Sequence, residues 1–157
     1  MLSNQQLTML YTLSQLGCRP AVNYDGTLSL QCQGENFRIE FRGMSARISL
    51  PMWAGIKADD PELPQIREAV NATNFNFGPT VVLTAPNDKG VIDIHCHRDI
   101  MLHPAPSDNK SLIKAALVTF FNTKEKVCDN LRQIKAKQMK ASKTYHPKAL
   151  LTSPKDE

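Results

Sequence analysis

Three side chains with metal-binding chemistry, Asp93, His95 and His97, alternate along one segment of the sequence. Alternate residues of a β-strand project from the same face, about 6.5–7 Å apart. Imidazole and carboxylate groups are ordinary zinc ligands, but a closed zinc site needs four of them. The sequence offers no further ligand at a matching spacing. The pattern therefore leaves two interpretations, a small-molecule or metal-binding face and an ordinary polar strand face, and it favours the second.

Cys96 lies between two histidines, which are the residue types that a nucleophile and its general base require. Because neighbouring residues of a strand point to opposite faces, His95 and His97 are poorly placed to deprotonate the Cys96 thiol. The sequence also lacks the Gly-x-Ser-x-Gly nucleophile motif, the phosphate-binding glycine loop and the dinucleotide-binding glycine motif. We therefore expect no catalytic residues, no cofactor and no enzymatic activity.

Arginine side chains recur on the polar side of the segment that precedes Trp53. Arg38, Glu40, Arg42 and Arg47 share this side if the strand alternation holds. Guanidinium groups can make bidentate contacts with carboxylates of a partner, and tryptophan is enriched at interfaces. We therefore take the three arginines and Trp53 as candidate protein-binding residues. The alternatives are a solvated face with internal ion pairs, and a tryptophan that anchors the core or its edge.

The segment from residue 24 to residue 51 determines how these side chains are placed. Apolar and polar residues alternate in three successive stretches, 28–33, 37–42 and 46–50. This period of two is typical of strands with one buried face. Turn-forming residues separate the stretches: Asp25-Gly26, Gly34-Glu35-Asn36 and Gly43. The pattern predicts an antiparallel meander with one dry face that other elements must cover.

Helical periodicity and turn signals predict the remaining elements. They are a helix over 3–16, a strand over 19–24, a helix from Asp60-Pro61 to Phe77, strands over 80–85 and 91–98, and a helix from Ser107 or Asp108 to Gln138. The predicted order is α-ββββ-α-ββ-α. One antiparallel sheet, made of the meander and a hairpin and covered by helices, would bury all the apolar stripes, so the fold class is α+β.

Length and composition suit one domain with a sizeable core, since the chain has 157 residues, of which 41% are hydrophobic and 22% charged. From residue 107 onward there are 11 basic and 5 acidic residues. The apolar periodicity ends near Gln138, so we predict a single α+β domain over 1–138 and a basic, flexible C-terminal tail over 139–157. The tail has one aromatic residue, Tyr145, which is too few for base stacking, and a nucleic-acid partner is not expected.

The cellular location is also inferred from what the sequence lacks. No window approaches the ~20 apolar residues of a membrane span, and the N-terminus has neither the basic nor the apolar region of a signal peptide. These features favour the cytoplasm and no membrane partner. The four scattered cysteines are then expected to be free thiols, and a structural disulfide between two of them is the less favoured alternative. They are Cys18, Cys32, Cys96 and Cys128.

Several short motifs lie in a characteristic order. They are Leu16-Gly17-Cys18-Arg19-Pro20, Asp25-Gly26-Thr27-Leu28, Gly34-Glu35-Asn36-Phe37-Arg38-Ile39, Leu50-Pro51-Met52-Trp53 and Asn71-Ala72-Thr73-Asn74. With the element order, they resemble the YbjN-like family of small bacterial proteins, whose fold is that of the type III secretion chaperones. The resemblance implies a non-enzymatic protein-binding module, chaperone-like or regulatory, in a bacterial cytoplasm, with a protein partner and often a dimeric state.

The second half of the last predicted helix carries more apolar surface than a small sheet can cover. Its stripe from Ile113 to Ile134 runs about 30 Å at the rise of an α-helix. We therefore predict a homodimer in which Val127, Leu131 and Ile134 contact a second chain. The sequence offers a second dimer surface, the unpaired edge of the strand over 19–24, which could pair with another chain. In the alternative interpretation, the three apolar residues fold back on the first helix of their own chain. Light scattering coupled to size exclusion would distinguish a dimer from a monomer of 17.5 kDa.

Overall fold

The computed structural model describes residues 1–76 and 78–144, and the element order predicted from the sequence is confirmed. The elements are α1 (Asn4–Gln15), β1 (Arg19–Val22), β2 (Leu28–Cys32), β3 (Glu35–Arg42), β4 (Ser45–Lys57), α2 (Leu63–Asn74), β5 (Thr80–Leu83), β6 (Val91–Met101), the 3₁₀ turn η1 (Pro106–Asp108) and α3 (Asn109–Thr144). The fold class is α+β, as predicted.

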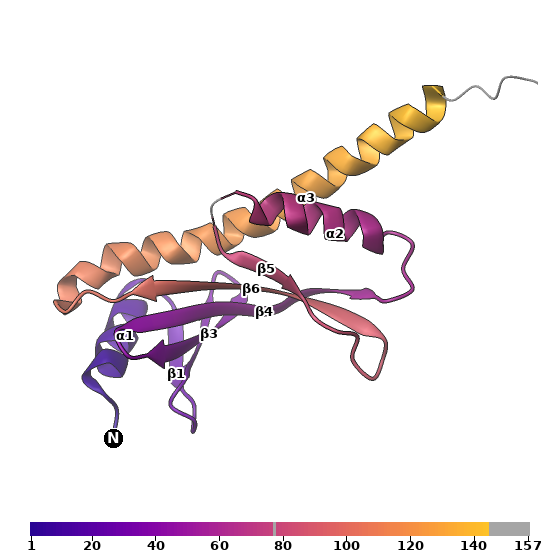
Figure 1. Ribbon diagram of the computed structural model, residues 1–157. Coiled ribbons are helices and arrows are strands. Elements are labelled where there is room, and N and C mark those ends of the chain that lie inside the picture. The colour runs from indigo at the N-terminus through magenta and orange to yellow at the C-terminus, as the bar shows by residue number, and fades with distance from the viewer. Residues whose placement is uncertain (77, 145–157) are drawn as a thin grey trace, which may run out of the picture.

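The strands form one antiparallel sheet of six strands in the order β1-β2-β3-β4-β6-β5 (Figure 1). Strands β2 to β4 are the predicted meander, and β1 is the strand predicted over 19–24. The β5–β6 hairpin joins the sheet through β6, which pairs with β4 along most of its length. Tight turns connect the meander strands, and the turn between β2 and β3 places Gln33 and Gly34 at φ values of 49° and 82°. Two successive positive values are typical of a two-residue hairpin turn that matches the strand twist.

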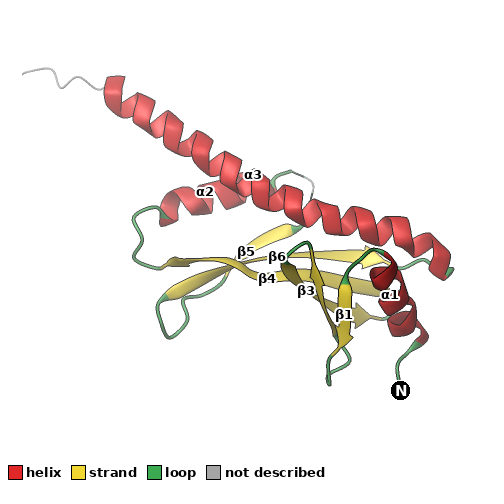
Figure 2. Cartoon of the chain, turned by 180° about the vertical axis from the view of Figure 1, so that it is seen from behind, coloured by secondary structure: helices red, strands yellow, loops and turns green. Residues whose placement is uncertain are grey.

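The helices cover one face of the sheet. Helices α2 and α3 lie over the same side of the sheet, and α1 lies at its β1 end (Figures 1 and 2). The inward-pointing residues of the strands and of α3 form a single hydrophobic core. The members with the lowest exposure include Leu28, Ile39, Ala46, Ile48, Cys96 and Phe120. No described helix covers the opposite face, which carries the polar half of each alternating strand.

Strand β4 is longer than the sequence suggested. The prediction ended the meander at Leu50-Pro51-Met52-Trp53, but β4 continues to Lys57 after a bulge. The register with β6 shifts between Leu50 and Ala54, and Met52 adopts a φ of 48°. A non-glycine residue with positive φ permits this local bend, which propensity rules do not anticipate.

Both boundaries of α2 differ from the predicted ones. Helix α2 begins at Leu63, because the Asp60 carboxylate accepts the Glu62 N–H over 2.8 Å in a turn and does not cap the helix. Its last residue is Asn74, whose side-chain amide binds both backbone groups of Val81, over 2.8 and 2.9 Å. The helix end is thereby tied to β5.

Helix α3 is 36 residues long and continues to Thr144. The predicted boundary at Gln138 was therefore too early, and residues 139–144 are helical. Lysine, alanine and methionine are strong helix formers, so the last turns need no apolar stripe to continue the helix. The rest of the predicted tail, residues 145–157, lies outside the described residues. None of the described helices has both the length and the apolar character needed to cross a membrane.

Candidate functional site

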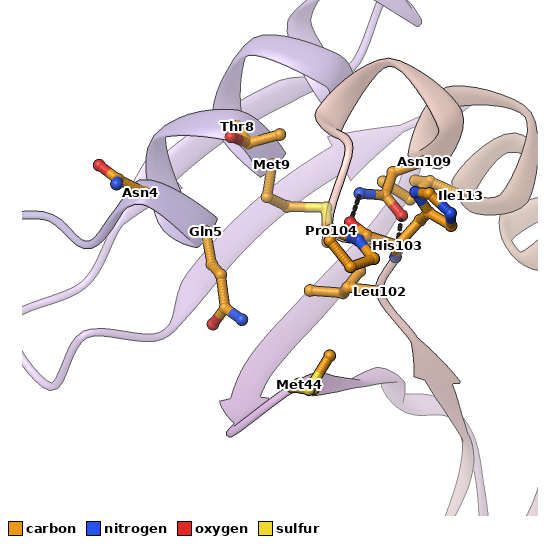
Figure 3. Close-up of a pocket in the computed structure, with 10 residues that line it drawn as sticks. All are labelled: Asn4, Gln5, Thr8, Met9, Met44, Leu102, His103, Pro104, Asn109 and Ile113. Atoms are coloured by element: carbon orange, nitrogen blue, oxygen red, sulfur yellow. Dashed lines mark hydrogen bonds between the residues drawn. The ribbon is translucent and has the colours of Figure 1, made fainter.

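A pocket lies where α1, the β3–β4 turn and the loop from β6 to α3 meet (Figure 3). Its volume is about 270 Å³. It is lined by Asn4, Gln5, Thr8, Met9, Met44, Leu102, His103, Pro104, Asn109 and Ile113. Three segments far apart in the sequence build it, so its shape depends on tertiary packing.

The floor of the pocket is apolar and its rim is partly apolar. Met9 and Ile113 are 2% and 1% exposed, and Met9 extends from α1 toward Pro104 and Leu102 (Figure 3). Met44, at the turn between β3 and β4, is 58% exposed. A backbone hydrogen bond of 2.9 Å from the Leu102 N–H to the Met44 carbonyl joins the turn to the loop. An apolar group that entered the pocket would therefore contact a buried surface already packed against the core.

One buried amide holds the loop wall of the pocket in place. Asn109, which is 4% exposed, begins α3. Its Oδ1 accepts the His103 N–H over 2.7 Å, and its Nδ2 donates to the His103 carbonyl over 2.9 Å (Figure 3). The Ala105 N–H donates to His103 Nδ1 over 3.0 Å, so the imidazole also serves the loop backbone. These bonds tie the proline-containing loop to the start of α3.

The polar groups that line the pocket are mostly amides and a hydroxyl. His103 is the one titratable side chain among the lining residues, and its Nδ1 is already an acceptor for the loop. The other polar groups come from Asn4, Gln5, Thr8 and Asn109, which can donate and accept hydrogen bonds but do not transfer protons near neutral pH. The arrangement suits binding of an apolar group with a polar edge.

Sequence reasoning missed this pocket. The prediction began the last helix at Ser107 or Asp108, and it gave no role to the loop before that helix or to Met44. The available signals were a methionine beside the turn glycine and an asparagine at the start of a helix. Neither signal indicates that the two residues lie close to α1, because that requires knowledge of how α1 packs.

The predicted arginine face exists, and its residues do share one side of the sheet. Arg47 lies directly opposite Asp99 in the β4–β6 register. Its Nε and Nη2 donate to Asp99 Oδ1 and Oδ2 over 2.7 and 2.8 Å, a bidentate pair. These bonds hold the pKa of the Asp99 carboxyl below its ordinary value of 3.8. Arg47 is thus already bound to a carboxylate of its own chain.

The other two candidate arginines also have acidic partners in the chain. Arg42 Nη2 donates to Glu40 over 3.0 Å, and Arg38 Nη2 donates to Asp25 over 2.6 Å. The arginine face therefore carries ion pairs within the chain, as in the alternative interpretation from the sequence. A partner carboxylate would have to compete with these contacts, which weakens the case for the arginines as a binding site.

We expect the Arg47–Asp99 pair to make stability sensitive to acid. A carboxyl whose pKa is lowered in the folded state stabilises that state above its unfolded pKa and loses the contribution as the pH falls through the folded pKa. The effect should begin near pH 4 and stay small, because the Asp99 side chain is 51% exposed. Arg47→Gln should raise the pKa of Asp99, measured by an NMR titration.

The matched control for this titration is Arg132→Gln, which removes the same charge from the exposed surface of α3. It should leave the pKa of Asp99 where it is. If Arg47→Gln also left that pKa unchanged, the bidentate pair would not be the cause of the low value.

Trp53 is an anchor and not a free surface residue. Its indole Nε1 donates to Cys96 Sγ over 3.1 Å, and Lys124 Nζ lies 5.6 Å from the ring centroid, within cation–π range. Lys124 also forms an ion pair with Glu35. Burial raises the pKa of the Cys96 thiol to about 11, so the thiol stays protonated and is a weak nucleophile.

The proposed metal-ligating face does not gather ligands. Asp93, His95 and His97 lie on β6 as predicted, but Ser49 and Thr80 flank His97 on the neighbouring strands. Across residues 1–76 and 78–144, no group of three or more histidine, cysteine, aspartate or glutamate side chains could hold a metal ion. The geometry favours the polar-strand interpretation.

The apolar stripe assigned to a second chain lies against α2 of the same chain. Val127 is 5% exposed and belongs to the core, and Leu131 and Ile134 are half-buried. Side-chain hydrogen bonds join this part of α3 to α2 and to Glu62 just before it. Asn130 donates to Thr73, Lys135 to Glu62, and Gln65 to Gln138. The partner within the chain is thus α2, and not the first helix. The homodimer stays a prediction, but the apolar surface on which it was based is covered by α2.

Comparison with known proteins shows the fold. No protein-family model matches the chain, and no curated protein matches it by sequence. Among solved structures, YbjN from E. coli, a proposed transcription regulator, has a TM-score of 0.51 at 12% identity, covering 83% of this chain and 91% of YbjN. An uncharacterised protein from Methanothermobacter thermautotrophicus has a TM-score of 0.53 at 15% identity, covering 82% of this chain and 96% of that one. The chain therefore has a YbjN-like fold, as the sequence motifs predicted.

Proposed function

We propose that this YbjN-like chain is a non-enzymatic protein-binding module, chaperone-like or regulatory, that works in a bacterial cytoplasm. Its partner would insert an apolar side chain into the pocket between α1, the β3–β4 turn and the loop from β6 to α3. The observation that carries the proposal is the combination of a buried apolar floor with an exposed methionine at the rim. A regulatory role also agrees with the description of YbjN as a proposed transcription regulator.

The size of the pocket supports a side chain as the occupant. Pockets for drug-sized ligands and cofactors measure about 300–1,000 Å³, whereas this one measures about 270 Å³. Methionine is flexible and polarizable, so Met44 can adapt to an apolar group that enters beside it. Asn4, Gln5 and Thr8 line the same opening and can bind the backbone of the inserted segment.

The open sheet face is the rival surface. Arg38 and Arg42 are exposed and Arg47 is partly exposed, but each is already paired with a carboxylate of the chain. Exposed ion pairs contribute little energy, and a partner that replaced one would gain little. The pocket offers apolar contact that no described side chain of the protein now uses.

Two double variants separate these surfaces. Met44→Glu with Thr8→Glu places carboxylates at the opening of the pocket, where an apolar side chain would have to bury them. Arg42→Glu with Arg47→Glu reverses the charge of the open face. The tagged wild-type protein and both variants are incubated with a lysate of the source organism, and the captured proteins are identified by mass spectrometry.

We expect a protein captured by the wild type to be retained by the face variant and to bind the pocket variant at least tenfold more weakly, since burying an unpaired charge is costly. Circular dichroism of both variants establishes that they are folded. If only the face variant failed to capture the protein, the binding site would be the open face of the sheet and not the pocket. Equal capture by all three proteins would exclude both surfaces.

A further inference from the structure

Two thiols face each other at the junction between α1 and the first strand. Cys18 lies between α1 and β1, and Cys32 is the last residue of β2. The Cys18 S–H donates to Cys32 Sγ over 2.8 Å. A disulfide bond is about 2.05 Å long, so the two sulfurs need to approach by only ~1 Å to be bonded.

The backbone places the two residues opposite each other. Arg19 pairs with Gln31 in the β1–β2 ladder, so Cys18 and Cys32 occupy the next pair of positions along it. Opposed residues of an antiparallel pair have Cα atoms roughly 4.5–5.5 Å apart, which lies within the separation that disulfides span. A bond between the sulfurs therefore does not require the strands to move apart or to change register.

Tight turns hold each cysteine in place. Gly17, at a φ of 78°, ends α1, and the Cys18 N–H donates to the Leu13 carbonyl over 3.1 Å. This is the hydrogen bond of a glycine-terminated helix, and it fixes the residue that follows the glycine. Cys32 directly precedes the two-residue turn that connects β2 to β3. The thiols are thus brought together by the fold and do not depend on a mobile loop.

The two thiols have different environments. Cys18 is 6% exposed, whereas Cys32 is half-buried and more accessible to a small oxidant. Burial and the hydrogen bond to Cys32 raise the pKa of the Cys18 thiol to about 12. Cys32 is therefore the thiol that reacts first, and Cys18 is the one that resolves the intermediate.

We propose that Cys18 and Cys32 form a reversible intramolecular disulfide, which makes this corner of the fold a redox-sensitive modification site. With a disulfide oxidant such as oxidised glutathione, Cys32 attacks one glutathione sulfur and releases reduced glutathione. The Cys18 sulfur then displaces the second glutathione from Cys32 and loses its proton. In total, two protein thiols are oxidised to one disulfide, and one glutathione disulfide is reduced to two thiols.

The position of the pair determines what the bond does. Strand β1 has four residues and lies at the edge of the sheet, where β2 is its one strand neighbour. The bond would close a loop of the 15 residues from Cys18 to Cys32. It would tie the end of α1 and the start of β1 to β2, so local opening of this edge would require reduction first.

The test uses the full-length reduced protein and oxidised glutathione. After incubation, remaining thiols are alkylated in denaturant and the protein is digested with trypsin, which does not cleave the Arg19–Pro20 bond. Residues 1–38 then remain one peptide that contains both cysteines. We expect this peptide to carry no alkyl groups and to be lighter by two hydrogen atoms than the same peptide with two free thiols. Thermal unfolding of the oxidised protein should occur about 5–10 °C higher, and a reductant should reverse both changes.

Three variants make the outcome decisive. Cys128→Ser, which removes the exposed thiol of α3, should behave as the wild type. Cys32→Ser should leave Cys18 alkylated, and Cys18→Ser should leave glutathione attached to Cys32. If the 1–38 peptide of the oxidised wild type carried two alkyl groups, the pair would not be a site of disulfide formation. An unchanged or lower Tm after oxidation would overturn its stabilising role.

Discussion

Replacing Phe120 with alanine is expected to lower the free energy of unfolding by about 3–5 kcal/mol, the usual cost of truncating a buried phenylalanine. Phe120 is a fully buried residue of α3. Its ring contacts that of Phe37 edge to face, with centroids 5.4 Å apart at an interplanar angle of 85°. The substitution leaves a cavity between α3 and β3 and removes the aromatic contact. Because a small domain has only about 5–15 kcal/mol of stability, the variant should lose a large fraction of it.

Urea denaturation followed by circular dichroism measures this loss. The control is Val118→Ala on the same helix, where the side chain is 47% exposed. Its effect should lie within about 0.5 kcal/mol, as for most surface substitutions. Equal losses in the two variants would mean that Phe120 is not where α3 is anchored to the sheet.

Replacing Asn109 with alanine should cost about 2–3 kcal/mol and should also alter the pocket. The side chain is buried, and it satisfies both the N–H and the carbonyl of His103. Its removal leaves two partly buried backbone groups without their partners, and each such group costs about 1–3 kcal/mol unless water replaces the bond. Asn109→Asp keeps the acceptor and loses the donor, so it should have an intermediate effect.

The measurement combines urea denaturation with amide chemical shifts of Leu102 and His103. Asn76→Ala is the control, since Asn76 donates to the Ala72 carbonyl at an exposed helix end. It should change the free energy of unfolding by no more than about 0.5 kcal/mol, and it should leave the amide chemical shifts of Leu102 and His103 unchanged. Unchanged shifts in Asn109→Ala would show that the loop keeps its conformation without this residue.

The sheet was predictable because its signals are local. Leu28 and Leu30 alternate with polar residues within one strand, and Gly34 provides the positive φ of the following turn. Each inference uses residues that are close in the sequence, where the period of two and the turn chemistry act directly. The same holds for the end of α1 at Gly17.

The candidate site was not predictable because it depends on contacts between distant segments. The candidate binding residue Arg47 is paired with Asp99, which lies 52 positions away in the sequence. Nothing near either residue in the sequence indicates that the two side chains meet. The pocket depends on the packing of α1 beside Met44 and Asn109, for which the sequence carries no pattern. The prediction assigned the stripe from Val127 to Ile134 to a second chain, or else to the first helix, whereas in the structure it lies against α2.

The length of α3 has a mechanical consequence. At a rise of 1.5 Å per residue, its 36 residues form a rod of about 54 Å. A compact domain of this size has a radius of gyration of roughly 15 Å, which corresponds to a sphere roughly 40 Å across, so the rod is longer than the body to which it is attached. Helix α3 begins at Asn109 in the wall of the pocket, and its last turns extend away from the sheet (Figure 1). Phe120 and Val127 fix the middle of the helix in the core, so α3 holds its lysine-rich end at a set distance from the pocket.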